Sequence, residues 1–296
     1  MKGIYLYCGL SRQAHHKAIQ RQLSQLEKEN LYIRMMEQTR EIHPGMGMRT
    51  MYDMVEPEGI GRDAFIALGL KEGFRLKTVE KFVRTTYSIR SHRYRNLLVG
   101  KWFTGVNQVW SSDITYYYGL GRFYYLVLIM DVYSRRILGY SLADNMRAEN
   151  NLNALKMALN LRGKNHYHNQ LIHHSDKGSQ YVSDIYIDLL YDYGIQISMC
   201  DEVYENTHIE RVHDTIKNQY LNRLSISSES ELKAKVDRVI EIYNTQRPHQ
   251  SLMGLTPVDY EVYIETIPIK KRLKMEIYTV NKIENQDLNQ LNISFN

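Results

Sequence analysis

The sequence predicts an α/β protein in which a mixed sheet is flanked by helices and preceded by a small all-α region. Three observations predict this arrangement. Three consecutive strand-like runs lie between residues 109 and 142, separated only by short turns. Helical and strand patterns then alternate as far as about residue 220. The first 88 residues, in contrast, contain mainly helical patterns.

The composition is that of a folded protein with an unevenly placed positive charge. Hydrophobic residues make up 43% and charged residues 24% of the 296 residues, which excludes wholesale disorder and leaves room for two domains. The segment 62–101 holds ten Lys and Arg residues against three acidic ones, interleaved with Tyr87, His92 and Tyr94. Such a segment favours binding to a phosphate backbone, although an ordinary solvated basic face is an equally supported interpretation.

Other features of the sequence indicate the cellular compartment of the protein. Cys8 and Cys200 are far apart and form no disulfide or metal-ligand pattern, as is typical of a reducing cytoplasm. The longest apolar run, 124–130, is much shorter than the ~20 residues of a membrane helix. The first residues lack the apolar core of a secretory signal. We therefore expect a cytoplasmic protein that has no membrane partner.

The first 88 residues are predicted to form a helical DNA-binding region. A helix is expected from Ser11, with Ile19, Leu23 and Leu26 as an amphipathic stripe. A break at residues 43–47 separates it from shorter helices at 49–55, 62–70 and 77–87. The cluster is compatible with a helix-turn-helix module or with a plain helical bundle. Residues 89–105, which carry charge but little periodicity, are interpreted as a basic linker.

Residues 106–264 are predicted to form a single core. The pattern indicates a three-stranded meander, then helices and strands in alternation, and last a helix introduced by a capping box at Ser228 and Glu231. This order is that of a ribonuclease-H-like fold. The expected strands are 109–118, 123–132, 136–142, 170–174 and 195–199, and the expected helices are 148–161, 182–193, about 204–220 and one after residue 228. Residues 265–296 are interpreted as a loosely ordered tail.

Three carboxylates sit on elements that converge in such a fold. Asp113 lies in the first strand, Asp176 follows the fourth strand, and Glu210 lies in the helix after the fifth strand. Open α/β sheets place their sites at the carboxyl ends of strands. Like charges held together require cations to stay ionised, and a pair of Mg²⁺ ions would suit an in-line phosphoryl displacement. These residues are therefore the candidate catalytic and metal-binding group.

Each candidate has an alternative. A lone aspartate in a strand or glutamate on a helix is usually a cap or a solvated side chain. Asp214 is a second choice for the third carboxylate, because it points further from the apolar stripe than Glu210 does. Lys217 lies on the same side of that helix as Glu210 and would contact phosphate, or would be a plain surface lysine. A zinc site at His173, His174 and Asp176 is disfavoured, because adjacent strand residues face opposite sides.

At these residues the chain resembles the integrase-like core of DDE-type bacterial insertion-sequence transposases, in the group with a small upstream reading frame and a larger catalytic one. The resemblance covers about residues 9–260. The motifs are GLSRQAHHK, WSSDIT, the turn Asp131–Arg135, HSDKGSQY at His174–Tyr181, SMC at Ser198–Cys200, YENTHIERVHDTIKNQYL and YNTQRPHQSLMGLTPVDY at Tyr243–Tyr260. Thr207 and His208 stand where that family usually has small residues.

The resemblance implies an integrase catalytic core that acts on DNA. Asp113, Asp176 and Glu210 match the family triad, which implies Mg²⁺ or Mn²⁺, with two ions. Lys217 matches the basic residue seven places after the glutamate. The closing motif at Arg247, Pro248 and His249 is structural or contacts DNA. The residues expected to contact DNA are Lys217, Lys177, Arg90, Arg93, Arg95 and Arg247.

The function expected is metal-dependent strand cleavage and strand transfer at insertion-sequence ends, without a covalent protein–DNA intermediate. Transposon ends and target DNA are the expected partners, with a homo-oligomer on DNA, the product of an upstream frame and a nucleoid location also implied. Two other classes remain open. A nuclease or resolvase of the same fold would cut without joining, and a binding protein with an inactive core would retain DNA without chemistry.

Overall fold

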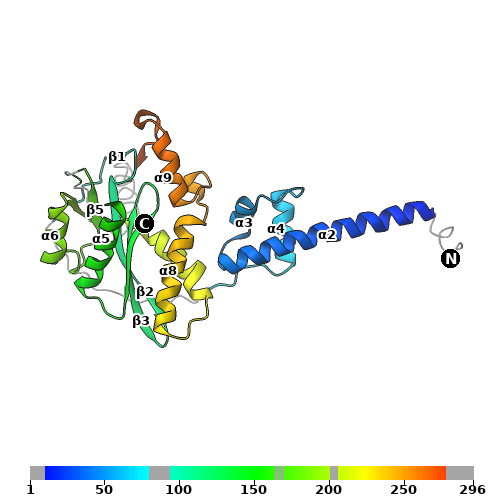
Figure 1. Cartoon of the computed structure of the whole chain (residues 1–296), viewed down its shortest axis with the longest axis horizontal. Coiled ribbons are helices and arrows are strands. Elements are labelled where there is room, and N and C mark those ends of the chain that lie inside the picture. The colour runs from blue at the N-terminus through cyan, green and yellow to red at the C-terminus, as the bar shows by residue number, and fades with distance from the viewer. Residues whose placement is uncertain (1–10, 80–93, 164–166, 168–169, 201–205, 278–296) are drawn as a thin grey trace, which may run out of the picture. The chain divides into compact units, whose positions relative to one another are not determined.

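The computed structural model describes residues 11–79, 94–163, 167, 170–200 and 206–277. The chain divides into two compact units, Met1–Thr78 and Val79–Asn296 (Figure 1). Arg90, Arg93 and Cys8 lie outside the described residues, as does most of the helix expected at 77–87. Residues 77–79, its first three, are described and are not helical. The helix-turn-helix interpretation stays a prediction.

The N-terminal unit is built on one long helix. Its Ser11 Oγ accepts a hydrogen bond from the Ala14 backbone N–H at 3.1 Å, which caps the helix as the sequence predicts. The predicted stripe of Ile19, Leu23 and Leu26 is exposed, however, because the unit's core gathers around the helix's other end. The helices are α2 (Arg12–Ile42), α3 (Met48–Val55) and α4 (Arg62–Lys71), and the core includes Tyr32, Met36, Met46, Met51 and Phe65.

The second unit contains the predicted mixed sheet. The strands run in the order β4-β3-β2-β5-β6, antiparallel across the first three and parallel across β2, β5 and β6. This confirms the meander, the later α/β alternation and the ribonuclease-H-like order. The bounds are β2 Val109–Gly119, β3 Arg122–Asp131, β4 Ile137–Ala143, β5 Ile172–Ser175 and β6 Gln196–Met199.

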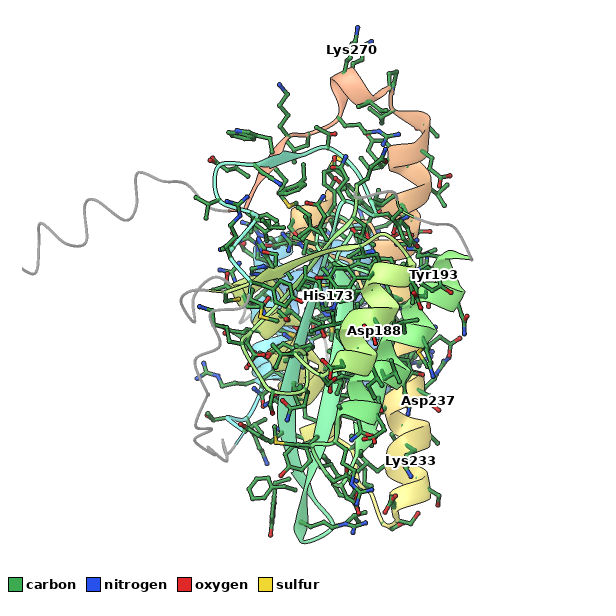
Figure 2. All side chains as sticks on the ribbon, turned by 90° about the vertical axis from the view of Figure 1, so that its left-hand side faces the viewer. His173, Asp188, Tyr193, Lys233, Asp237 and Lys270 are labelled. Carbon is green, nitrogen blue, oxygen red and sulfur yellow. The ribbon has the colours of Figure 1, made fainter. Side chains whose placement is uncertain are left out.

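Helices cover both faces of this sheet, as predicted (Figures 1 and 2). Along β3, Leu126 and Leu128 face the side of α7 and α8, whereas Val127 and Ile129 face the side of α5 and α6. A Cβ on Gly139 of β4 would lie 2.0 Å from the Ala154 carbonyl oxygen, so α5 can pack this closely only against glycine. The bounds are α5 Ala148–Arg162, α6 Asp184–Asp192, α7 Thr207–Asp214 and α8 Glu229–Thr245.

The segment after β6 differs from the single helix that the sequence predicts. Helix α7 passes at Thr215–Tyr220 into a π-helical stretch, and a 3₁₀ turn follows at Leu221–Arg223. Its predicted buried face is confirmed, since Ile209, Val212, Ile216 and Tyr220 are at most 4% exposed. The predicted side of the helix is therefore correct, but its winding is not uniform.

Residues 265–277, the described part of the expected tail, contain more regular structure than the sequence suggests, and residues 278–296 lie outside the described residues. Helix α9 (Pro257–Thr266) runs past the predicted core boundary, and β7 (Met275–Glu276) pairs antiparallel with β1 (Trp102–Phe103). This pairing joins part of the expected tail to part of the expected linker. Leu98, also in that linker, is buried in the core. No helix among the described residues combines the length and apolar character needed to cross a membrane.

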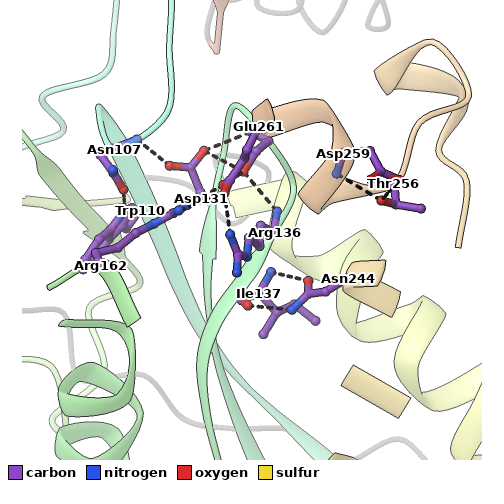
Figure 3. Close-up of polar contacts among 11 residues, drawn as sticks. Asn107, Trp110, Asp131, Arg136, Ile137, Arg162, Asn244, Thr256, Asp259 and Glu261 are labelled. Carbon is purple, nitrogen blue, oxygen red and sulfur yellow. Dashed lines mark hydrogen bonds and ion pairs between the residues drawn. The ribbon is translucent and has the colours of Figure 1, made fainter. Parts of the chain in front are cut away.

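Glu261 anchors α9 to the sheet through a buried ion-pair network (Figure 3). Its carboxylate accepts hydrogen bonds from Ser134 Oγ at 2.7 Å, from Arg136 at 2.6 Å and from both terminal nitrogens of Arg162. Burial opposes ionisation, but the Arg162 hydrogen bonds prevail and lower the pKa of Glu261. The neighbouring Asp131 accepts from the backbone of Asn107, Tyr133 and Ser134, which fixes the β3–β4 turn.

We predict that Glu261→Gln destabilises the second unit by about 3–5 kcal/mol, because it removes the buried carboxylate that pairs with both Arg162 and Arg136. Guanidinium unfolding followed by tryptophan fluorescence measures this, since both tryptophans, Trp102 and Trp110, lie in that unit. Glu241→Gln, which removes an exposed partner of Arg238, is the control and should cost about 0.5 kcal/mol or less. Equal effects of the two changes would contradict this role of Glu261.

Candidate active site

Parallel pairing of β2 with β5 places the two candidate aspartates side by side. The last paired residues of this ladder are Ser112 and Ser175. Asp113 is the next residue of β2, and Asp176 directly follows β5. Neighbouring strands lie about 4.8 Å apart, so both carboxylates stand at the same point of the sheet, at the carboxyl end of β5.

The electrostatics of Asp113 connect four of the predicted residues. Burial, then the negative charges of Asp176 and Glu210, raise the pKa of Asp113 from 3.8 to about 8. The Ile114 backbone N–H and the charge of Lys217 act in the opposite direction. Asp113 therefore sits within range of both other carboxylates and of the predicted lysine.

Asp176 is held by its own loop. Its Oδ1 accepts a hydrogen bond from the Gly178 backbone N–H at 3.0 Å. A Cβ on Gly178 would lie 3.0 Å from that same oxygen, so the glycine permits this close approach. Partial desolvation raises the pKa of Asp176 although its side chain still reaches solvent. The loop thus fixes one carboxylate oxygen and leaves the other available.

Glu210 is less closely placed. It lies in the first turn of α7, is exposed, and has a pKa raised by desolvation. Within the described part of the chain, no three Asp, Glu, His or Cys side chains are grouped closely enough to hold a metal ion. The strand register therefore brings Asp113 and Asp176 together, and Glu210 is near enough for its charge to act on Asp113. Its rival Asp214 accepts a hydrogen bond from Asn218 at 2.5 Å instead.

Lys217 faces the acidic site. Its Nζ donates to Thr115 Oγ1 at 2.8 Å. Thr115 is two residues beyond Asp113 on β2 and shares its face of the sheet. The lysine reaches this strand from the π-helical stretch, so the predicted proximity of Lys217 to the acidic residues holds despite the change in winding.

His213 is a site residue that sequence reasoning missed. It is 3% exposed, and its Nε2 lies 3.3 Å from the Asp113 carbonyl oxygen and 3.6 Å from Asp113 Oδ2. Burial, then the charge of Lys217, lower the pKa of His213 to about 3, so the ring is neutral at physiological pH. Its position three residues after Glu210, on the same side of the helix, was the available signal.

Asn206 ties the start of α7 to β2. Its Nδ2 donates to the Ser112 carbonyl oxygen at 3.1 Å, and its Oδ1 accepts from Ser111 Oγ. Ser112 Oγ also lies 2.9 Å from the hydroxyl of Tyr181 in the loop after Asp176. These buried contacts were not foreseen, and they hold the three segments that carry the acidic residues at one place.

The two histidines of the zinc alternative have separate structural partners. His173 Nε2 lies 2.8 Å from the Tyr186 hydroxyl. His174 contacts Ser198 Oγ at 2.9 Å and Cys200 Sγ at 3.1 Å. The two rings thus bond to different elements, as expected for adjacent strand residues. They serve the core, and the zinc interpretation is not supported.

The expected DNA-contacting residues differ in their surroundings. Arg95 is exposed, and Lys177 is partly exposed beside Asp176. Arg247 is engaged inside the fold, where it donates to Gln219 Oε1 at 3.0 Å and to the Pro248 carbonyl oxygen at 3.3 Å. Its contacts fit the structural interpretation of the closing motif, and DNA contact by these residues stays a prediction.

Comparison with known proteins adds the family. Residues 104–203 and 193–257 match two families that are both described as integrase core domain. The "Insertion element IS600 uncharacterized 31 kDa protein" of Shigella sonnei is 31% identical over 85% of this chain and 95% of its own length. The "Transposase InsF for insertion sequence IS3A" of Escherichia coli K12 is 31% identical over 64% of this chain and 67% of its length.

A third relative and a solved structure complete the comparison. The "Transposase for insertion sequence element IS904" of Lactococcus lactis is 34% identical over 54% of this chain and 63% of its own length. The catalytic core domain of HTLV-2 integrase in complex with magnesium matches 53% of this chain at 20% identity and a TM-score of 0.44, too low to transfer a function. The integrase core matches and these relatives show that the chain belongs to the DDE-type transposases of insertion sequences.

Proposed function

We propose that this transposase cleaves and joins DNA at the ends of an insertion sequence through Asp113, Asp176 and Glu210. The observation that carries the proposal is the parallel pairing of β2 with β5, which places Asp113 beside Asp176, and the pKa of Asp113, raised by burial and by the charges of both other carboxylates, agrees with it. Two aspartates at a strand end, with a glutamate and a lysine nearby, suit the binding of a phosphate and the cations that accompany it. DNA transposition is also the activity named for the relatives.

The donor set fits a hard divalent cation. Asp113 and Asp176 offer oxygen ligands at one place, and a cation between them would relieve the repulsion that the charge of Asp176 exerts on Asp113. Mg²⁺ or Mn²⁺, as a pair of ions held by the three carboxylates, would activate the attacking oxygen and neutralise charge on the phosphate. Glu210 would complete this set by a short approach from the first turn of α7.

The chain's own residues would then bind and orient the DNA. Lys217 would move its ammonium group from Thr115 to a phosphate oxygen near Asp113. Neutral His213 would hold the backbone and carboxylate of Asp113 in place without adding charge. The Gly178 N–H would orient Asp176 in the same way. No protein nucleophile is required, so a covalent protein–DNA intermediate is not expected.

The remaining assignments extend this proposal to the whole chain. Residues 1–88 would bind DNA, 89–105 would form a basic linker, 106–264 the catalytic core, and 265–296 the C-terminal tail. Transposon ends and target DNA would be the substrates, acted on by a homo-oligomer in the nucleoid. The product of an upstream frame would be a further partner. Joining two ends to a target requires several DNA sites at once, which favours an oligomer.

We predict that Asp176→Asn and Glu210→Gln each lower strand joining by about a thousandfold or more, which corresponds to roughly 4 kcal/mol at the transition state. DNA affinity without metal should stay within about twofold of the wild-type value, because the basic surface is unchanged. The assay uses a short duplex that carries the element's end, with Mg²⁺. Asp214→Asn is the matched control and should retain joining.

The outcomes separate the competing functions. Cleavage without joined products by the wild-type protein would indicate a nuclease or resolvase, and DNA retention without any chemistry would indicate a binding protein. Loss of joining in Asp214→Asn, with activity kept in Glu210→Gln, would move the third carboxylate to Asp214. A trapped protein–DNA adduct would contradict the proposed mechanism.

We also predict that Asp113→Asn stabilises the metal-free protein increasingly as pH rises from about 4 to about 8. The folded-state pKa of Asp113 lies above the unfolded value of 3.8, so between these two values the folded wild-type protein holds a proton more tightly than the unfolded chain does. The free energy of unfolding of the wild-type protein therefore falls as pH rises across this window. Thermal unfolding in EDTA at several pH values measures the difference. The exposed Asp188→Asn serves as control, and a pH-independent effect of Asp113→Asn would contradict the coupling.

A further inference from the structure

A second polar site lies on another side of α7. It is a pocket of about 160 Å³ between the β3–β4 turn, α7 and the loop that follows α8. We call it the basic pocket, and its polar lining is Arg135, His208, Arg211, Thr215, His249 and Ser251. Among the residues that the structure describes, the lining of this pocket includes no acidic side chain. Arg211 and Ser251 are exposed, so the pocket opens to solvent.

The basic pocket is separate from the acidic site. His208, Arg211 and Thr215 follow one another at spacings of three and four residues and so share one face of the helix. Glu210 lies two residues after His208. At ~100° per residue, the side chain of Glu210 therefore points ~200° around the helix axis from that of His208. An α-helix with its side chains is about 10 Å thick. The phosphate that the carboxylates act on therefore cannot occupy the basic pocket.

Arg135 is held in the pocket by an unusual backbone. Its φ of 62° lies in the left-handed region, which non-glycine residues adopt rarely and often at functional sites. Asp131 stabilises this turn by accepting hydrogen bonds from the backbone N–H groups of Tyr133 and Ser134. The Nη1 atom of Arg135 is buried and has no hydrogen-bond partner among the described residues. A buried cationic donor of this kind calls for a ligand.

The positive charges of the pocket act on one another. Burial, and to a smaller degree the charge of Arg211, lower the pKa of Arg135, whereas the charge of Asp131 acts in the opposite direction. Burial and then the charges of Arg135 and Arg211 lower the pKa of His208 to about 3. Burial, followed by the charges of Arg247 and Arg135, lowers that of His249 to about 3. The two guanidinium groups thus repel neighbouring positive charge, and a bound anion would relieve that repulsion.

We propose that the basic pocket binds one phosphate group of the DNA backbone, at a nucleotide that flanks the reacting phosphodiester. The inference rests on the proposed function, because it takes DNA as the substrate. Guanidinium groups match phosphate oxygens in pairs, and the hydroxyls of Thr215 and Ser251 add neutral donors. The pocket is smaller than the ~300–1,000 Å³ of small-molecule sites, which favours one tetrahedral group over a whole nucleotide.

The test combines protein variants with modified DNA. The full chain is titrated in EDTA with duplexes that carry the element's end, each with one phosphate replaced by an uncharged methylphosphonate. In the wild-type protein, replacement at one flanking position should weaken binding about tenfold. In Arg211→Gln that replacement should have little further effect, and the salt dependence of binding should fall by about one unit of slope. Arg135→Gln should reproduce this result, which guards against a local folding defect in either variant.

Lys156→Gln is the matched control, because it removes an exposed positive charge from α5 on the opposite face of the sheet. The inference is overturned if Arg211→Gln responds to every methylphosphonate as wild type and Lys156→Gln do. A second outcome would also overturn it. If inorganic phosphate raises the melting temperature of the wild-type protein but not that of Arg211→Gln, and both proteins bind DNA equally well, the pocket binds a free anion and not the DNA backbone. Failure of the wild-type protein to bind or join DNA at all would instead overturn the proposed function.

Discussion

The parallel pairing of β2 with β5 is the constraint on which the rest of the site depends. The ladder ends at Ser112 and Ser175, so the next residue on each strand is an aspartate. Backbone hydrogen bonds set this neighbourhood, and neither side chain contributes to it. The fold thus places two carboxylates together, and burial, followed by the charge of Asp176, makes ionisation of Asp113 costly and raises its pKa. A cation, a proton or a shift of one side chain can relieve that cost.

The surroundings of the two aspartates limit which of these responses is available. Asn206 bonds to Ser111 and Ser112 and so ties the start of α7 to β2, which keeps Glu210 and His213 near Asp113. The π-helical stretch then carries Lys217 back toward the same strand. One short helix therefore presents an acidic face to the sheet end and a basic face to the pocket of Arg135 and Arg211. In the proposed function, this division would let α7 contact one DNA molecule at two separate places.

Much of the fold could be predicted because burial imposes a period on the sequence. The continuous apolar run of β3 and the apolar spacing of Ile209, Val212 and Ile216 located these elements within a few residues. Long-range pairing could not be predicted, since no local pattern connects Trp102–Phe103 with Met275–Glu276. The π-helical winding was missed for a related reason, because it keeps the same residues buried as a plain helix would.

The residues of the candidate site likewise divide into those that a sequence pattern predicts and those that only the packed structure reveals. Asp113 and Asp176 could be predicted as candidates from their positions inside the first strand and directly after the fourth, and Glu210 and Lys217 from helical spacing together with the family motif. Asn206 could not, because a buried amide follows no sequence pattern that separates it from ordinary core residues, and the sequence signal for His213 is its spacing of three residues from Glu210. Arg247 carries a charge that suggests DNA, yet its donors serve Gln219 and Pro248, which only the packed structure reveals. The exposed stripe of Ile19, Leu23 and Leu26 shows likewise that apolar spacing does not guarantee burial.

The most direct test of this account is the location of Mn²⁺ by anomalous scattering in crystals of the protein with a DNA end. We expect anomalous peaks between Asp113 and Asp176, with carboxylate oxygens of both at about 2.1 Å and Glu210 completing the coordination. Such peaks would show that the adjacent aspartates form the metal site of the enzyme. Peaks located elsewhere, with these two carboxylates left without an ion while DNA is bound, would contradict the account.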